Sequence, residues 1–466
     1  MRNRPNSKNR QRQRRRRRIM EEYDLIVIGA GSGLDVASAY NARGDKVALI
    51  EPGPLGGTCL NRGCIPSKML IHRAEIASTI KEAEKFGINA EINQINFSDI
   101  TKEVSEAVSN DSEAIESGVK NADNYDLYRS EAKFVEDKVV EVDGEKLKAE
   151  KIVIAAGTRP FIPPINGLEQ TDYLTSKDAL ELEDKPDSMV IVGGGYIAAE
   201  LAFFYSEMGV EITIVERGDA LLKRMDRELS EKFTELAQER YNVVLEASAQ
   251  KLEQKEDKKV AVLDNGEEVE ADQVLMATGR RPNTDKLQLE ENTSIELDDR
   301  GLVETDEHLE TNVENVYALG DIAGNFMFKH SANLEAEYVY KNSLGIEEEA
   351  DFTAMPYAVF TKPQMAGVGN TEQELEEDST DYNKSVYNYE NTGMGMALKE
   401  ENGFVKVLAS KNGEILGVHI LGPEASTLIH EVLPVMRKNG KVEDIKRTIH
   451  IHPALNEVMG RAFDQL

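Results

Sequence analysis

Two stretches of the chain share one pattern of apolar and glycine-rich positions. In residues 23–51 an apolar run is broken by Gly29-Ala30-Gly31-Ser32-Gly33 and then resumes, and in residues 189–216 the break is Gly193-Gly194-Gly195 followed by a helical run. A buried strand, a glycine turn, a helix and a second strand make one βαβ unit. The sequence therefore predicts an α/β protein with two such units.

Two similar segments mark the points where the chain leaves these units. Residues 152–160 and 274–282 both read as an apolar strand that runs into a turn with Gly, Arg and Pro. An acidic and polar stretch over 342–351 then precedes a region of short strands and helices. We expect five segments: a basic extension at 1–19, a first nucleotide-binding domain at 20–166, a second at 167–276, a return to the first at 277–351, and a third domain at 352–466.

The composition excludes several classes of protein. The 466 residues are 40% hydrophobic, which is enough for several buried cores, so a disordered or fibrous chain is ruled out. No run of 18 consecutive apolar residues occurs, and the sequence predicts no membrane-spanning helix. The formal charge is −30, and it is −40 over residues 19–466. Such a body repels nucleic acid and anionic membrane, and a salt-adapted source is our hypothesis for it.

Residues 1–18 contain nine Arg and one Lys without an acid. One interpretation is an arm that binds nucleic acid or another partner. We favour a disordered extension, or a start codon placed too early with Met20 as the true first residue, because the rest of the chain is acidic. No apolar region of the secretory type follows this stretch, so we expect a cytoplasmic protein.

Both glycine turns carry a dinucleotide-binding fingerprint. The second turn reads Gly193-x-Gly195-x-x-Ala198, with Glu216 twenty-one residues past its second glycine, and the first reads Gly29-x-Gly31-x-x-Leu34, with Glu51 twenty residues past its second glycine. Small residues let a pyrophosphate approach the helix N-terminus, and the acid binds a ribose hydroxyl. Leu34 replaces the usual Gly or Ala, which predicts a wider separation of helix and strand there. One match is weak evidence, but two in one chain make ordinary strand-to-helix turns an improbable explanation.

The chain has two cysteines, Cys59 and Cys64, which follow Glu51 closely and are thus placed beside the first nucleotide site. Alone, such a pair fits inert thiols or half of a metal site, but zinc is disfavoured because no other Cys and no adjacent His cluster exist. Residues five apart on an α-helix have Cα atoms about 8.6 Å apart, whereas a disulfide needs less than about 7 Å. A disulfide would therefore require a departure from helix geometry, which Gly63 and Pro66 make easier. A nearby helix N-terminus would lower the pKa of the thiols.

The segment from Gly56-Gly57-Thr58-Cys59 to Cys64-Ile65-Pro66-Ser67-Lys68, with the two fingerprints, resembles the class I flavoprotein disulfide reductases. This is the family of glutathione reductase, dihydrolipoamide dehydrogenase, mycothione reductase and mercuric reductase, and the resemblance covers the chain from about residue 22 to its end. It implies two Rossmann-like domains, with FAD on the first and a nicotinamide nucleotide on the second. It also implies an α+β C-terminal interface domain that makes an obligate homodimer.

By position, the resemblance implies roles for individual residues. Cys59 resembles the interchange thiol and Cys64 the charge-transfer thiol of a redox-active disulfide. His452 resembles the general acid/base that acts on the other subunit, and Glu457 resembles the acid that orients it. The other residues expected at the site or the cofactors are Lys68 paired with Glu200 near the flavin, Tyr196 as a lid over the nicotinamide, Asp321 at the flavin ribityl chain, and Gly29, Gly31, Ser32, Gly33, Glu51, Gly57, Thr58, Gly157, Gly193, Gly195, Ala198, Glu216, Arg217, Lys223 and Gly279.

These roles imply a sequence of thiol exchanges. Electrons from the nicotinamide nucleotide reach the cysteine pair by way of FAD, Cys59 attacks a substrate disulfide, His452 protonates the departing thiol, and Cys64 resolves the mixed disulfide. We expect Cys64→Ser to leave flavin reduction possible but to abolish turnover. His419 and His450 are interpreted as structural.

The choice of nucleotide rests on a few positions. Glu216 would repel a 2′-phosphate and favours NADH. Arg217 and Lys223 stand where NADP-dependent relatives place their phosphate-binding cations, and Ala198 and Ala202 match the same group. We predict NADPH, with NAD as the alternative.

The expected substrate is a small cellular disulfide. Residues 328–336 and 452–455 look closer to mycothione reductase than to glutathione reductase, and in a salt-adapted prokaryote the thiol would be γ-glutamylcysteine. The chain ends without a second cysteine pair, which disfavours mercuric ion as a substrate. The alternative is a dihydrolipoamide dehydrogenase, which Glu216 and residues 450–453 also fit. A nucleic-acid-binding protein is the interpretation from a different class, and the acidic body argues against it.

Overall fold

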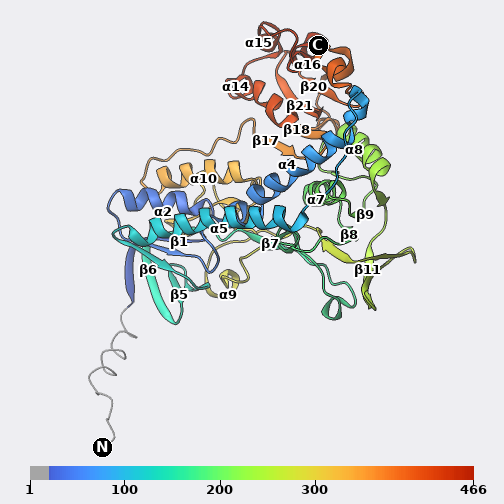
Figure 1. Ribbon diagram of the computed structural model, residues 1–466. Coiled ribbons are helices and arrows are strands. Elements are labelled where there is room, and N and C mark those ends of the chain that lie inside the picture. Colours follow the sequence, from blue (N-terminus) through green and yellow to red (C-terminus); the bar gives the residue numbers. More distant parts are fainter. Residues whose placement is uncertain (1–19) are drawn as a thin grey trace, which may run out of the picture. The chain divides into compact units, whose positions relative to one another are not determined.

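The computed structural model describes residues 20–466 (Figure 1), so the extension expected at 1–19 lies outside the described residues. The described chain divides into two compact units. Unit 1 consists of 20–65, 106–159 and 280–351, and unit 2 consists of 66–105, 160–279 and 352–466. Each unit contains one of the two βαβ motifs predicted from the sequence.

The first βαβ motif is confirmed in unit 1 by β1 (Glu21–Ile28), α2 (Gly33–Ala42) and β2 (Val47–Ile50). The strands pair in parallel with Leu25 opposite Val47, and the parallel order is β3-β2-β1-β6, with β16 on β6. Both faces of this sheet are covered, because Leu25, Ile26 and Val27 are all fully buried. The other elements are β3 (Tyr125–Tyr128), β4 (Ala132–Glu136), β5 (Val139–Val142), β6 (Glu145–Ile154), β7 (Thr158–Pro160), β15 (Arg280–Pro282), β16 (Val316–Ala318), α3 (Gly57–Arg62), α9 (Leu289–Asn292), α10 (Lys329–Asn342) and the 3₁₀ turn η3 (Gly320–Ile322).

The second βαβ motif is confirmed in unit 2 by β8 (Ser188–Val192), α7 (Tyr196–Glu207) and β9 (Glu211–Val215). These strands form a parallel sheet of order β10-β9-β8-β14. The remaining elements of this part are α6 (Ser176–Leu180), α8 (Arg227–Arg240), β10 (Asn242–Val244), β14 (Gln273–Met276), η1 (Ala83–Phe86), η2 (Leu168–Gln170), and the antiparallel sheet of β11 (Ala249–Lys255), β12 (Lys258–Leu263) and β13 (Glu268–Ala271).

The C-terminal part of unit 2 is a five-stranded antiparallel sheet of order β17-β18-β21-β20-β19. Its strands are β17 (Pro356–Val359), β18 (Gln364–Gly369), β19 (Asn383–Asn388), β20 (Phe404–Ala409) and β21 (Ile415–Gly422). Its helices are α11 (Glu372–Glu377), α12 (Gly393–Leu398), α13 (Ala425–Leu428), α14 (Leu433–Met436), α15 (Val442–Lys446) and α16 (Glu457–Asp464), with 3₁₀ turns η4 (Tyr389–Asn391) and η5 (Ile429–Glu431). Helix α16 packs on β19 and β20. The expected fold class, two Rossmann-like sheets and an α+β C-terminal region, is confirmed.

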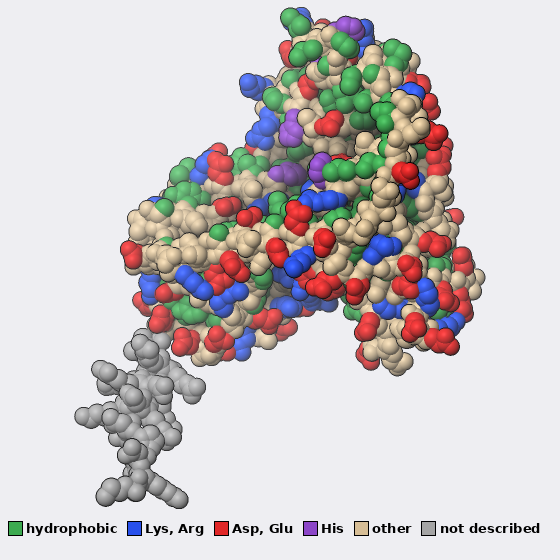
Figure 2. Space-filling model, viewed as in Figure 1, with side chains coloured by type: hydrophobic (Ala, Val, Ile, Leu, Met, Phe, Trp, Pro, Cys, Tyr) green, Lys and Arg blue, Asp and Glu red, His purple; other side chains and the backbone are tan. Residues whose placement is uncertain are grey.

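Two long helices, α4 (Cys64–Lys81) and α5 (Phe97–Asn121), each contain residues of both units. Residues 66–105, which the sequence placed with the first domain, cluster with unit 2 because Leu70, Ala74 and Phe97 share a core with α7. Acidic side chains are spread over the face drawn in Figure 2, with Lys and Arg among them. None of the helices within residues 20–466 has the length and apolar character needed to cross a membrane.

Candidate active site

The first glycine turn of unit 1 is built for close approach of the backbone. Gly29 has φ +104°, and a Cβ on it would lie 2.2 Å from the carbonyl oxygen of Ala155. A Cβ on Gly33 would lie 2.7 Å from the Ala155 Cβ, so helix α2 packs tightly against the sheet at Gly33. The wider separation expected at Leu34 is therefore wrong, because the close contact is made one residue earlier.

Glu51 lies at this turn and is held by its backbone. Its carboxylate accepts hydrogen bonds from the backbone N–H of Ala30 at 3.0 Å and of Gly53 at 2.8 Å. Each carboxylate oxygen keeps a further lone pair, so a ribose hydroxyl can still donate to it. Lys329, at the start of α10, donates from Nζ to Ser32 Oγ at 2.7 Å and brings a positive charge to the same turn.

The second glycine turn, in unit 2, repeats this geometry. Gly193 has φ +115°, and a Cβ there would lie 2.4 Å from the carbonyl oxygen of Ala277. This clash matches the one between a Cβ on Gly29 and the carbonyl oxygen of Ala155. Glu216 accepts from the Gly218 N–H at 2.8 Å and lies against Gly194. Gly195 faces open space, with no atom within 4 Å of a Cβ placed on it.

The remaining residues expected at the second turn lie on α7 and after β9. Ala198 is fully buried, whereas Tyr196 is 40% exposed at the first position of α7. Lys223 forms an ion pair with Asp219 at 2.7 Å, and both side chains are well exposed. Arg217 is exposed next to Glu216.

The cysteine pair lies on two successive helices. Helix α3 holds Cys59 and ends at Gly63, whose φ of −150° and ψ of −114° leave helix geometry, and Cys64 begins α4. The interruption that a disulfide would require between these positions is thus present. Gly57 places the segment against the first glycine turn, since a Cβ on Gly57 would lie 2.6 Å from the Gly31 Cα.

Both cysteines are thiols, and they hydrogen-bond to each other. This hydrogen bond, together with burial, raises the pKa of Cys59, and the positive charge of Lys329 acts more weakly in the opposite direction. The lowered pKa expected from a helix N-terminus is therefore wrong for Cys59, because Cys64 beside it favours the protonated form.

Asp321 is held in unit 1 by residues that the sequence interpretation did not single out. Thr158 Oγ1 donates to Asp321 Oδ2 at 2.7 Å, and Arg280 Nε donates to the same Thr158 oxygen at 2.7 Å. Glu335, almost fully buried, accepts from the Gly320 N–H at 2.5 Å. Burial raises the pKa of Glu335 to about 7. Thr158 and Arg280 each follow a predicted glycine, Gly157 and Gly279, which was the available signal.

Lys68 and Glu200 form the expected pair within unit 2. Lys68 Nζ lies 2.9 Å and 2.7 Å from the two carboxylate oxygens of Glu200, which is only 5% exposed. Glu200 also accepts from the Phe360 N–H at 3.0 Å, and Lys68 Nζ lies 4.6 Å from the centre of the Phe360 ring. Helix α7 and the end of β17 thus fix the ammonium group four residues after Cys64 along α4.

His452 and Glu457 also form the expected pair. His452 Nδ1 lies 2.9 Å from Glu457 Oε1, and the other Glu457 oxygen accepts from the Ala454 N–H at 3.2 Å. The hydrogen bond with His452 lowers the pKa of Glu457. The His452 side chain is 76% exposed, so its Nε2 faces outward. His450, by contrast, contacts Glu431 at 2.5 Å and is mostly buried.

The geometry of both turns fits a dinucleotide. Open space lies where a side chain would be at Gly157, Gly195 and Gly279. At Gly29 and Gly193, by contrast, a side chain would clash with the neighbouring backbone. One acid lies at each turn, Glu51 at the first and Glu216 at the second. Backbone N–H groups at a helix start with no side chain in front of them suit a pyrophosphate.

Comparisons with known proteins agree with this geometry. Residues 23–336 match the family model described as pyridine nucleotide-disulphide oxidoreductase, and residues 355–463 match its dimerisation domain. The chain is 36% identical to a mycothione reductase of Mycobacterium tuberculosis over 95% of this chain and 99% of that protein. It is also 36% identical to a dihydrolipoyl dehydrogenase of Bacillus subtilis, over 94% and 95% of the two chains.

More distant relatives widen this picture. A mercuric reductase of Staphylococcus aureus is 33% identical over 91% of this chain and 79% of that protein. Among solved structures, the HOCl-induced flavoprotein disulfide reductase RclA from Escherichia coli superposes with a TM-score of 0.85 at 26% identity, over 95% of this chain and 99% of that one.

Proposed function

Because the chain belongs to the pyridine nucleotide-disulphide oxidoreductase family, we propose that it reduces the disulfide of a small cellular thiol with electrons from NADPH. It is an oxidoreductase related to flavoprotein disulfide reductases. The observation that carries the proposal is the Cys59 and Cys64 pair, two hydrogen-bonded thiols whose segment is packed against the first glycine turn through Gly57 and Gly31. A dithiol next to a dinucleotide cradle is suited to passing two electrons to a disulfide.

The first turn is the proposed FAD site. Gly29, Gly31 and Ser32 would hold the pyrophosphate, Glu51 a ribose, and Asp321 the ribityl chain. When bound, FAD would carry two electrons from the nicotinamide to the thiols. Lys68, held by Glu200, would place a positive charge near the flavin ring.

The proposed thiol chemistry needs a base. The pKa of Cys59 is raised in the dithiol, so its proton must be removed before the sulfur can attack. His452 Nε2 is suited to take it, because Nδ1 is engaged by Glu457. The Cys59 thiolate then bonds to one substrate sulfur, the substrate S–S bond breaks, and His452 returns the proton to the departing sulfur. Cys64 finally attacks Cys59, which releases the second thiol and leaves a Cys59–Cys64 disulfide.

A homodimer is part of this proposal. The dimerisation domain matched at 355–463 supports it, and so does an exposed apolar segment, since Ile449 is 96% and Ile451 is 77% exposed beside His452. Apolar side chains this exposed are typical of an interface. In the dimer, His452 would act on Cys59 of the second copy. We propose the cytoplasm as the compartment, where thiols remain reduced.

NADPH rather than NADH is the finer part of the proposal. Arg217 and Lys223 supply positive charge after β9, and Ala198 gives α7 close packing. Glu216 opposes a 2′-phosphate, and Lys223 is partly neutralised by Asp219. The charge of Glu216 and the Lys223–Asp219 ion pair favour NADH as the second candidate.

Two relatives of equal identity support two different substrate classes. The mycothione reductase supports a low-molecular-weight disulfide, and in a salt-adapted prokaryote bis-γ-glutamylcystine is the corresponding compound. The dihydrolipoyl dehydrogenase, together with Glu216, supports NAD-linked oxidation of dihydrolipoyl groups as the second candidate function. The mercuric reductase is less similar, at 33% identity.

The deciding experiment compares catalytic efficiencies of the FAD-loaded enzyme in high KCl. Bis-γ-glutamylcystine, mycothiol disulfide and glutathione disulfide are each offered with NADPH and NADH, and dihydrolipoamide is offered with NAD. We expect one small disulfide with NADPH to give the highest kcat/KM, and Cys64→Ser to abolish it while flavin reduction remains. Faster oxidation of dihydrolipoamide would overturn the proposal in favour of the second candidate.

A further inference from the structure

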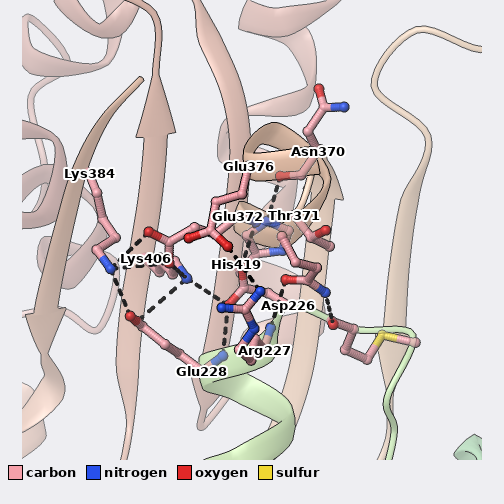
Figure 3. A network of polar contacts seen from close by, with 12 residues as sticks. Asp226, Arg227, Glu228, Asn370, Thr371, Glu372, Glu376, Lys384, Lys406 and His419 are labelled. Carbon is pink, nitrogen blue, oxygen red and sulfur yellow. Dashed lines mark hydrogen bonds and ion pairs between the residues drawn. The ribbon is translucent and has the colours of Figure 1, made fainter. Parts of the chain in front are cut away.

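A cluster of buried charges joins the second nucleotide fold to the C-terminal sheet within unit 2. Lys406, in the middle of β20, is fully buried, and its Nζ lies 2.8 Å from Asp226 Oδ1 and 2.6 Å from Glu372 Oε2. Figure 3 shows these side chains converging from α8, α11 and β20, with His419 of β21 beside them. None of them takes part in the proposed thiol chemistry.

Asp226 is the centre of this cluster. Its carboxylate caps α8 by accepting from the Glu228 N–H at 3.1 Å, and it also accepts from the Glu372 N–H at 3.0 Å. Burial alone would raise the pKa of Asp226, but His419 and Lys406 lower it, which keeps the carboxylate ionised. Any displacement of Asp226 would break three charge-assisted contacts at once.

The residues on either side of Asp226 are held by one side chain of α11. Gln373 donates from Nε2 to the Met225 carbonyl at 2.8 Å and accepts from the Arg227 N–H at 3.1 Å. The Arg227 guanidinium adds a contact of 3.0 Å to Glu376. The backbone at 225–227 is thus fixed by residues that lie about 150 positions later in the chain.

Residues 217–225 lie between Glu216 and Asp226, and we call them the 217–225 loop. The loop carries Arg217 and Lys223, the two cations proposed for the 2′-phosphate, and it begins beside the acid proposed for the ribose. Its middle is tied to the glycine turn, because the Leu222 N–H donates to the Gly194 carbonyl at 2.8 Å. Its far half is tied to helix α8, because Ser230 Oγ donates to the Leu221 carbonyl at 2.7 Å and the Leu221 N–H donates to Thr234 Oγ1 at 2.9 Å. Its end at Met225 is tied to the C-terminal region by Gln373.

Buried ion pairs add little stability compared with apolar side chains of the same volume, but they require one geometry. We propose that the Asp226–Lys406–Glu372 cluster, with Gln373, is a positioning group for nicotinamide-nucleotide binding, which holds the 217–225 loop in place from the C-terminal strands. This inference rests on the proposed function only in its assignment of the second fold to the nicotinamide nucleotide. It predicts that nucleotide affinity depends on residues that never touch the nucleotide.

The test is calorimetric titration of NADP⁺ and NAD⁺ into the oxidised, FAD-loaded enzyme. Gln373→Ala removes two hydrogen bonds to the end of the loop without leaving a buried charge, and Lys406→Met removes the central cation. Lys411→Met is the matched control, because Lys411 follows the same strand but forms an exposed ion pair with Asp381. FAD content and kcat at saturating nucleotide, with ferricyanide as acceptor, are measured on the same samples.

We expect Gln373→Ala and Lys406→Met to raise the Kd of the preferred nucleotide about tenfold, equivalent to about 1.4 kcal/mol, while FAD content and kcat stay within about twofold of wild type. The preference for NADP⁺ over NAD⁺ should fall, and Lys411→Met should behave as wild type. If Lys406→Met fails to fold, Gln373→Ala decides.

A Kd unchanged in folded Gln373→Ala would overturn the inference, and so would a parallel loss of FAD content and kcat, which indicates general destabilisation. Because no disulfide substrate is added in these titrations, failure of every disulfide as substrate would overturn the proposed function and leave this result standing.

Discussion

At the scale of single residues, the pKa of Cys59 depends on the second thiol beside it. The pKa of Cys59 is raised because Cys64 hydrogen-bonds to it. Replacing Cys64 by Ala removes that partner, so the pKa of Cys59 should fall. We expect the half-maximal rate of alkylation by iodoacetamide to be reached at a lower pH in reduced Cys64→Ala than at Cys59 of the reduced wild type. Mass spectrometry of the alkylated peptide separates the two cysteines, and an equal or higher midpoint would contradict the prediction.

Gly57 is the residue that brings the thiols to the first turn. It has φ +65°, and a Cβ would lie 2.6 Å from the Gly31 Cα. Gly57→Ala combines left-handed strain of about 1–2 kcal/mol with a backbone clash, so we expect it to purify with little FAD. Gly44→Ala is the control, since Gly44 has φ +94° but no atom within 4 Å of the added methyl. The ratio of flavin to protein absorbance measures both, and equal FAD content in the two variants would show that the clash is harmless.

At the scale of elements, α8, α11 and β20 are joined by ionised groups, and this makes their packing sensitive to acid. Burial would raise the pKa of Glu372, but hydrogen bonds from Lys406, Lys384 and Tyr382 lower it to about 2. A carboxylate with a lowered pKa stabilises the fold above its unfolded value of about 4.5, and that contribution is lost as the pH falls towards about 2. In Glu372→Gln we expect stability at neutral pH to be lower by about 2 kcal/mol and its decline between these pH values to be shallower.

Urea unfolding at several pH values measures this effect. Exposed Glu401→Gln is the control and should follow the wild type. A decline in Glu372→Gln as steep as that of the wild type would show that other carboxylates carry the acid sensitivity.

At the scale of the whole molecule, the proposed active site needs a second copy of the chain. Ile449, 96% exposed, is the most exposed of the large apolar side chains described. We expect Ile449→Glu to place a charge in the dimer interface and shift sedimentation towards the 51.9 kDa monomer. Disulfide reduction should fall with the dimer, whereas NADPH-dependent reduction of ferricyanide should remain. Ile346→Glu, at a 57% exposed position in unit 1, is the control, and a stable Ile449→Glu dimer would contradict the proposed interface.

The sequence predicted most of what lies close together along the chain. The two βαβ units and the Cys59 to Cys64 segment were accessible because turns need glycine and strands need apolar runs. His452 and Glu457 were accessible only through the resemblance. Thr158 and Arg280 around Asp321 were missed because their contacts join positions more than 120 residues apart, and a single sequence carries no distances.

The buried cluster at Asp226 was missed for the same reason, although one signal existed. Lys406 stands in β20 between Val405 and Val407, and all six residues of that strand are buried. A lysine in such a run must find a carboxylate, because an unpaired buried charge is too costly. The sequence showed the need for a partner, and the fold was required to show that the partners are Asp226 and Glu372.

The division of the chain into interleaved segments has a consequence for its synthesis. Unit 1 takes its last residues from 280–351, and unit 2 takes its last from 352–466. On the ribosome, β6 therefore emerges long before β16, its neighbour from the third segment, is available. Neither unit can close until chain elongation is well advanced, and the nascent protein carries an open edge at β6 until residues 316–318 have been made.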